Sequence, residues 1–240
     1  RSMRPFSKGA GEHFCVFESI YFARPDSNLM RSNVYSFRKE LGRTLAREHP
    51  VVADMVVPVL DSGTAAALGY AEETGIPYET ALIRNHYVKR TFIEPAQSIR
   101  NFGVKVKHNP MRGYLEGKRV VLVDDSIIRG TTLVKIVGLL RNSGAREVHL
   151  RISAPPSVAS CHYGINTPNS EELIAAQNSV EEIRDLMKAD SLGYLSLEGL
   201  HQVSDSQFKR GICDACFTGD YPVPVSAEER RKIIAARRPT

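Results

Sequence analysis

Several features of membrane, repetitive and disordered proteins are missing from this sequence. No apolar run approaches the roughly 20 residues of a membrane-spanning helix, and the first residues contain no hydrophobic stretch of signal-peptide type. There is no low-complexity tract and no repeat of fixed period, which argues against long disorder and against a solenoid. We therefore expect a cytoplasmic protein that has no membrane partner.

Cysteine is also scarce, and the excess of charge is small. Only four cysteines occur among 240 residues, and a cytoplasmic chain is not expected to join them in disulfides. Hydrophobic residues make up 42% of the chain and charged residues 25%, which is enough for one main domain with a full core. The net charge of +5 is partly explained by a basic C-terminal helix, which a capping box from Ser226 to Glu229 predicts. We therefore expect no nucleic-acid partner.

Helical and strand-like patterns alternate along the chain. The predicted elements are, in order, a helix at 33–48, a strand at 55–60, a helix at 64–74, a short strand at 78–83, a long loop at 84–117, a strand at 118–125, a helix from Leu133 to Gly144, a strand at 147–153 and a helical pattern beyond Pro156 with a capping box from Ser179 to Glu182. Strand, helix and strand joined by short connections form right-handed crossovers. The sequence therefore predicts an α/β fold, a mostly parallel sheet with helices on both faces.

The string VVLVDDSIIRGTT at 120–132 combines a strand, a loop and the start of a helix. Ligands of open α/β sheets bind beyond the carboxyl ends of the strands, where Asp124 and Asp125 are expected. Two adjacent carboxylates suit a pair of ribose hydroxyls, a divalent metal ion or both. The hydroxyls, guanidinium and backbone N–H groups that follow suit a phosphate at a helix N-terminus. Helix capping is the alternative for the acid pair alone, but the whole string favours a binding site.

This string resembles the signature with which type I phosphoribosyltransferases bind 5-phosphoribosyl-1-pyrophosphate (PRPP). Four other segments resemble one branch of that group, the glutamine PRPP amidotransferases. They are CVFESIYFARPDS at 15–27, VPVLDSG at 57–63, YVKRTFIEP at 87–95 and CDACFTGDYP at 213–222. The resemblance implies a type I phosphoribosyltransferase fold and the Mg²⁺-dependent displacement of pyrophosphate from PRPP by ammonia. The product would be 5-phosphoribosylamine, formed in the first step of purine synthesis.

The resemblance also implies roles for particular residues. Mg²⁺ would be bound by Ser62, Asp124 and Asp125, whose hard oxygen atoms are the ligands that this ion prefers. The residues implied in PRPP binding are Asp61, Ser62, Asp124, Asp125, Ser126, Arg129, Gly130, Thr131 and Thr132. The segment from Ser126 to Thr132 would hold the 5-phosphate.

Catalysis is expected to depend on positioning and electrostatics. Arg90 and Thr91 would belong to a loop that closes over PRPP, because a carbon with oxocarbenium character is easily hydrolysed unless water is excluded. Unprotonated ammonia is itself the nucleophile, so we expect no general base. His86 and His108 are accordingly interpreted as structural or surface residues.

The four cysteines gain a meaning only through the resemblance. Spacing alone leaves the CxxC of Cys213 and Cys216 as a zinc half-site, a redox pair or coincidence. In one class of the amidotransferases, cysteines at the positions of Cys15, Cys161, Cys213 and Cys216 hold a four-iron, four-sulfur cluster. A Cys₄ zinc site uses the same side chains and is the alternative. The metal group would clamp distant parts of the chain together.

The resemblance divides the chain into two parts. Residues 1–200 would form the phosphoribosyltransferase domain, in which 1–14 resemble a linker from a missing N-terminal glutaminase domain. Residues 201–240 would form a helical and irregular extension with the CxxC and the basic helix. Glutamine hydrolysis is therefore expected from another domain or a partner, and the use of free ammonia is the alternative. Family analogy suggests a homo-oligomer inhibited by purine nucleotides.

Some positions depart from the family pattern. Leu60 stands where Pro usually precedes Asp-Ser, and Leu133 and Val134 stand where serine and basic residues usually follow Gly-Thr-Thr. We therefore expect an altered affinity for PRPP or for nucleotides. The alternative functions are a non-catalytic PRPP-sensing regulator of the same fold and a salvage enzyme acting on a nucleobase. The sequence contains no recognisable DNA-binding helix pair, and the four cysteines favour the amidotransferase.

Overall fold

A parallel sheet forms the centre of the computed structural model, which describes residues 13–84, 108–167, 169–208 and 211–223. Within these residues the sheet has four strands in the order β4-β7-β8-β9, and every neighbouring pair is parallel. The strands are β4 (Met55–Pro58), β7 (Arg119–Asp124), β8 (Glu147–Ile152) and β9 (Ser191–Tyr194). The predicted parallel pairing of the strands is confirmed.

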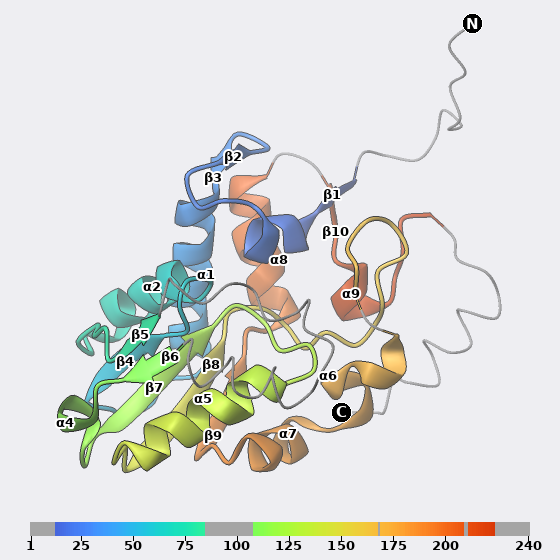
Figure 1. Ribbon diagram of the computed structural model, residues 1–240. Helices are drawn as coiled ribbons and strands as arrows, with labels where there is room; N and C mark the ends of the chain where they lie inside the picture. Colours follow the sequence, from blue (N-terminus) through green and yellow to red (C-terminus); the bar gives the residue numbers. More distant parts are fainter. Residues whose placement is uncertain (1–12, 85–107, 168, 209–210, 224–240) are drawn as a thin grey trace, which may run out of the picture.

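Helices cover both faces of this sheet (Figure 1). One face carries α1 (Val34–Glu48) and α2 (Thr64–Thr74), and the other carries α5 (Thr131–Asn142) and α7 (Val180–Met187). The predicted α/β architecture is therefore confirmed.

The strand β7 explains why its sequence is an unbroken apolar run. Val121 and Val123 belong to the core beneath α1 and α2, whereas Val120 and Leu122 belong to the core beneath α5 and α7. All four are fully buried. Because successive strand residues point to opposite faces, a strand covered on both sides must be apolar at every position.

Helix starts follow the local sequence signals. The Asn33 side chain caps α1 by accepting a hydrogen bond from the Ser36 N–H at 3.1 Å. The predicted capping box is present at α7, where Ser179 accepts from the Glu182 N–H and Glu182 accepts from the Ser179 N–H. These caps satisfy N–H groups that have no partner inside the helix.

Smaller elements surround the central sheet. They are β1 (His13–Cys15), the π-helix η1 (Glu18–Phe22), β2 (Asn28–Leu29), β3 (Ser32–Asn33), β5 (Leu82–Arg84), β6 (His108–Pro110), α4 (Arg112–Leu115), the 3-10 helix η3 (Ser170–Glu172), α6 (Ile174–Gln177), α8 (Leu197–Gln207), β10 (Gly211–Cys213) and α9 (Ala215–Thr218). The first described strand, β1, pairs in parallel with β10 near the other end of the described chain. The predicted basic helix from Ser226 onwards lies outside the described residues.

Two local predictions were wrong, and a third, the largely loop stretch at 84–117, is tested only in part. The strand expected at 78–83 is split, because Tyr78 forms a parallel bridge with Val56 whereas β5 pairs antiparallel with β6. The loop expected at 84–117 contains β6 and α4 in its described part. The helical pattern expected beyond Pro156 begins only at Ser170, since residues 157–167 form an irregular loop. The strand is split because its partners are distant in sequence, whereas local hydrogen bonds form the turn of α4.

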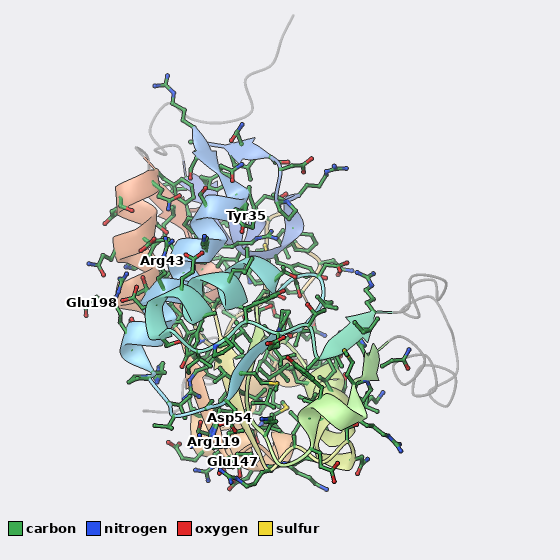
Figure 2. All side chains as sticks on the ribbon, turned by 90° about the vertical axis from the view of Figure 1, so that its left-hand side faces the viewer. Tyr35, Arg43, Asp54, Arg119, Glu147 and Glu198 are labelled. Atoms are coloured by element: carbon green, nitrogen blue, oxygen red, sulfur yellow. The ribbon has the colours of Figure 1, made fainter. Side chains whose placement is uncertain are left out.

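The amino ends of the strands carry charged residues. Arg119 at the start of β7 forms an ion pair with Asp54 at 2.8 Å, and Glu147 begins β8. Figure 2 shows these three side chains gathered at one end of the molecule. The carboxyl ends of β4 and β7 therefore lie at the opposite edge of the sheet.

None of the helices in the described ranges is long and apolar enough to cross a membrane.

Candidate functional site

The carboxyl ends of β4 and β7 bring Ser62 and the two acids together. The Ser62 hydroxyl donates to Asp124 Oδ1 at 3.1 Å, and the Asp125 N–H donates to the same oxygen at 2.9 Å. The Ser126 hydroxyl donates to Asp125 Oδ2 at 2.6 Å. Ser62 and Asp124 are 62 positions apart in sequence, so the parallel pairing of the two strands creates this contact.

Both carboxyl groups are buried, which is unusual for adjacent acids. Asp124 is 7% exposed and Asp125 is 5% exposed. Burial raises the pKa of Asp124 well above its ordinary value, and the negative charge of Asp125 raises it further. A cation bound here would offset the electrostatic repulsion between the carboxylates of Asp124 and Asp125.

The loop after β4 approaches β7 closely. The Val59 N–H donates to the Val123 carbonyl at 2.8 Å, and the Gly63 N–H donates to the Val59 carbonyl at 2.9 Å. A β-carbon on Gly63 would lie 2.3 Å from the Val123 oxygen. Only glycine permits this approach, which places Ser62 beside Asp124.

The loop after β7 leads into the N-terminus of α5. Gly130 caps the helix with a φ of 74°, a left-handed conformation that favours glycine. Thr131 is exposed and Thr132 is half-buried in the first turn. Helix N-termini present N–H groups and a positive dipole end, so this turn is suited to an anion.

Two predicted substrate-binding residues form ion pairs in this structure. Arg129 contacts Glu172 of η3, with an Nη2–Oε2 distance of 2.8 Å. Asp61 forms an ion pair with Arg84 at the end of β5. Both pairs are partly exposed to solvent, where such interactions are weak and a ligand can compete with them.

Arg38 is a residue near this site that the sequence analysis missed. Its side chain is only 5% exposed and donates to the carbonyls of Ser19 and Ala23 at 2.8 Å. Burial lowers the pKa of Arg38, while the negative charge of Asp125 acts in the opposite direction. The sequence did indicate that Arg38 is buried, because it lies four residues after Val34 on the apolar stripe of α1.

A second candidate site is a cavity of about 610 Å³ that all four cysteines line. The pairing of β1 with β10 sets Cys15 opposite Cys213. The Val158 and Ala159 N–H groups donate to the Cys216 carbonyl at 2.9 and 3.0 Å, which holds the loop of Cys161 against α9. Figure 1 shows this loop, which follows β8, beside α9.

The cysteines are not joined by disulfides, and their thiols influence one another. All four are free and half-buried. Burial raises the pKa of Cys216, and the charges of the other three thiolates raise it further. Among the residues that the structure describes, no group of three or more His, Cys, Asp or Glu side chains is arranged to hold a single metal ion.

The comparison with known families decides the classification. The phosphoribosyl transferase domain matches residues 37–157, which include the acid pair and the start of α5. This match spans more than half of the chain. This chain belongs to the phosphoribosyl transferase domain family.

Relatives of this phosphoribosyl transferase domain include plant and bacterial proteins. It is 56% identical over 220 residues to amidophosphoribosyltransferase 1, chloroplastic, of Arabidopsis thaliana, covering 90% of this chain and 38% of the relative. It is 54% identical over 225 residues to the amidophosphoribosyltransferase of Bacillus subtilis (strain 168), covering 92% and 47%. The predicted resemblance to the amidotransferases is therefore confirmed.

Two solved structures are similar along most of the domain. One is described as the structure of the allosteric regulatory enzyme of purine biosynthesis, and it covers 93% of this chain and 49% of its own. The other is the glutamine PRPP amidotransferase from B. subtilis complexed with ADP and GMP, with coverages of 93% and 50%. Each has a TM-score of 0.84 and 52% identity. The domain thus spans half or less of the length of these relatives.

The family departures lie at different depths in the domain. Leu133 is 2% exposed and belongs to the core beneath α5 and α7, whereas Val134 is 38% exposed. Leu60 is joined to Asp61 by a cis peptide bond.

Arg90, Thr91 and His86 lie outside the described residues. His108 is buried at the start of β6.

Proposed function

We propose that this chain is the phosphoribosyltransferase portion of an amidophosphoribosyltransferase. It would displace pyrophosphate from PRPP by ammonia and give 5-phosphoribosylamine, the first step of purine synthesis. The observation that carries this proposal is the meeting of Ser62, Asp124 and Asp125 with the N-terminus of α5 at one edge of the sheet. Similarity to amidophosphoribosyltransferases along about 90% of the chain supports the reaction.

Mg²⁺ fits the buried acid pair. Ser62, Asp124 and Asp125 would hold the ion, because they supply hard oxygen atoms and a negative charge that burial leaves poorly solvated. When bound, the ion would neutralise charge on the pyrophosphate as it leaves. The two carboxylates also suit the ribose hydroxyls of PRPP.

The segment from Ser126 to Thr132 would hold the 5-phosphate. Its N–H groups at the start of α5 and its threonine hydroxyls are donors for phosphate oxygen atoms. Arg129 would exchange Glu172 for the phosphate or contact both, since its guanidinium has five donors. With the ribose anchored at both ends, ammonia would attack in line opposite to the pyrophosphate.

Other parts of the reaction lie beyond the described residues or beyond this chain. Arg90 and Thr91 would close over PRPP, as the sequence predicts. Ammonia would come from a glutaminase domain or partner. The similarity to a relative solved with ADP and GMP supports purine nucleotides as inhibitors, and a homo-oligomer stays a prediction.

The four-cysteine cavity would hold a four-iron, four-sulfur cluster. Cysteine thiolates are the ligands that such clusters require. The cavity of about 610 Å³ is larger than a single ion needs. A cationic group would also relieve the mutual repulsion of the thiolates. The cluster would join the loop after β8 to β1 and β10.

The decisive assay is pyrophosphate release from PRPP and Mg²⁺, with and without ammonium, on protein purified without oxygen. We expect release that depends on ammonium and falls at least 100-fold in Asp124→Asn. Tight PRPP binding without turnover would instead indicate the non-catalytic regulator. Turnover that depends on a nucleobase would indicate a salvage enzyme.

The metal content is measured on the same preparation. About four irons per chain and a broad visible absorbance would support the cluster. One zinc per chain and a colourless protein would contradict it.

A further inference from the structure

Two segments close together beside the four-cysteine cavity. The first, residues 160–163, contains Cys161, and the second, residues 221–223, follows α9. The Tyr221 hydroxyl donates to the Ser160 carbonyl. The Tyr163 hydroxyl donates to the Val223 carbonyl at 3.2 Å and accepts from the Val223 N–H at 3.0 Å. These three hydrogen bonds join two segments that are about 60 positions apart.

Aromatic contacts reinforce the same junction. The Tyr163 and Tyr221 ring centroids are 6.0 Å apart at an interplanar angle of 70°. The His162 ring lies 4.8 Å from that of Tyr221, edge to face. Edge-to-face packing of this kind is favourable and directional. Ring packing and hydroxyl hydrogen bonds therefore both stabilise the junction.

The junction forms part of the cavity wall and is partly exposed to solvent. Tyr163, Tyr221 and Val223 all line the cavity, and Tyr163 and Val223 are about half exposed. The charges of Cys161 and Cys216 contribute to a raised pKa of Tyr221, whose main cause is burial. Tyr221 thus lines the same cavity as the cysteines, and its ring contacts the half-exposed ring of Tyr163.

We propose that Tyr163 and Tyr221 form a clasp that limits the access of oxygen, chelators and alkylating reagents to the four cysteines and to the group they bind. The part that concerns a bound cluster rests on the proposed function. The part that concerns the thiols does not, because the clasp is made by protein groups alone.

The hydroxyls provide a conservative way to open the clasp. Tyr221→Phe removes one of its hydrogen bonds and Tyr163→Phe removes two, while both changes keep the rings. One hydrogen bond of ordinary strength changes the population of an open state by roughly fivefold. Tyr35→Phe is the matched control, because Tyr35 is a partly exposed tyrosine on α1 that does not line the cavity.

The test measures thiol alkylation by iodoacetamide in the full-length chain, reduced and freed of metal, with each cysteine followed by mass spectrometry. We expect Cys161 and Cys216 to react about fivefold faster in Tyr221→Phe and faster still in Tyr163→Phe, with Tyr35→Phe unchanged. Equal rates in all four proteins would overturn the clasp. Melting temperatures identify a variant that has unfolded, and the remaining tyrosine variant then decides.

A second measurement uses protein purified without oxygen. If a cluster is present, its visible absorbance should fade about fivefold faster in air in the clasp variants than in the wild type. Equal fading despite faster alkylation would contradict control of oxygen access. Protein without a cluster but with faster alkylation would refute the proposed metal group and leave the clasp supported.

Discussion

Replacing Gly63 with alanine tests how Ser62 is positioned beside Asp124 at the carboxyl ends of β4 and β7. The new β-carbon would lie 2.3 Å from the Val123 carbonyl oxygen, which is backbone of β7 and has little freedom to move. Contacts between carbon and oxygen become strongly repulsive at that distance, so the loop must retreat by at least about 0.7 Å to reach 3.0 Å. Ser62 is the neighbouring residue and would move with it.

The size of the effect follows from one hydrogen bond. The Ser62 hydroxyl now lies 3.1 Å from Asp124, and a retreat of that size would stretch the distance to about 3.8 Å, beyond hydrogen-bond range. Misplacing a reacting group by about 1 Å can cost 100-fold in rate. We therefore expect Gly63→Ala to lower kcat/KM for PRPP by about 10- to 100-fold. Crowding should also lower stability by about 1–3 kcal/mol.

The control is the same substitution where there is space. A β-carbon on Gly138, inside α5, would meet no atom within 4 Å, and alanine is the better helix former by about 1 kcal/mol. Gly138→Ala should keep full activity and melt at the same or a higher temperature. Ammonium-dependent pyrophosphate release and PRPP calorimetry are run on both variants. Full activity of a folded Gly63→Ala would refute the close-approach argument.

Three more predictions concern the site and its support. Asp124→Asn should abolish Mg²⁺-dependent PRPP binding in calorimetry. It should also raise the melting temperature of the metal-free protein, because it removes a buried carboxyl group whose negative charge is repelled by that of Asp125. A lower melting temperature would contradict this. Gly130→Ala should weaken PRPP binding about tenfold, since its β-carbon would lie 2.3 Å from the Met187 methyl group at a φ of 74°; unchanged affinity would exclude strain there. Asp54→Asn should destabilise the protein at neutral pH. Arg119 lowers the pKa of Asp54, so the stability that this carboxylate contributes is present above about pH 4 and is lost as pH falls. The difference in the free energy of unfolding between wild type and variant, measured in urea, should therefore be smaller at pH 3 than at pH 7.

Much of the fold was predictable because its signals are local. The apolar stripe of α1, the continuous apolar run of β7 and the capping box at α7 all depend on residues a few positions apart. The strand expected at 78–83 was not predictable in detail, because its two ends pair with different strands. The place of Arg38 on the apolar stripe of α1 indicated burial, but its partners, the carbonyls of Ser19 and Ala23, were not predictable because they lie outside α1.

The sequence by itself determined the α/β architecture and the main residues of both candidate sites. Residue type and order identified the acids after β7, and the family resemblance identified the four cysteines. Only the tertiary structure decided that Ser62 donates to Asp124, that Arg129 meets Glu172, and that Tyr163 and Tyr221 close beside the cysteines. The physical reason is that burial, hydrogen bonds and electrostatic opposition depend on which distant segments pack together. That packing is a property of the whole chain.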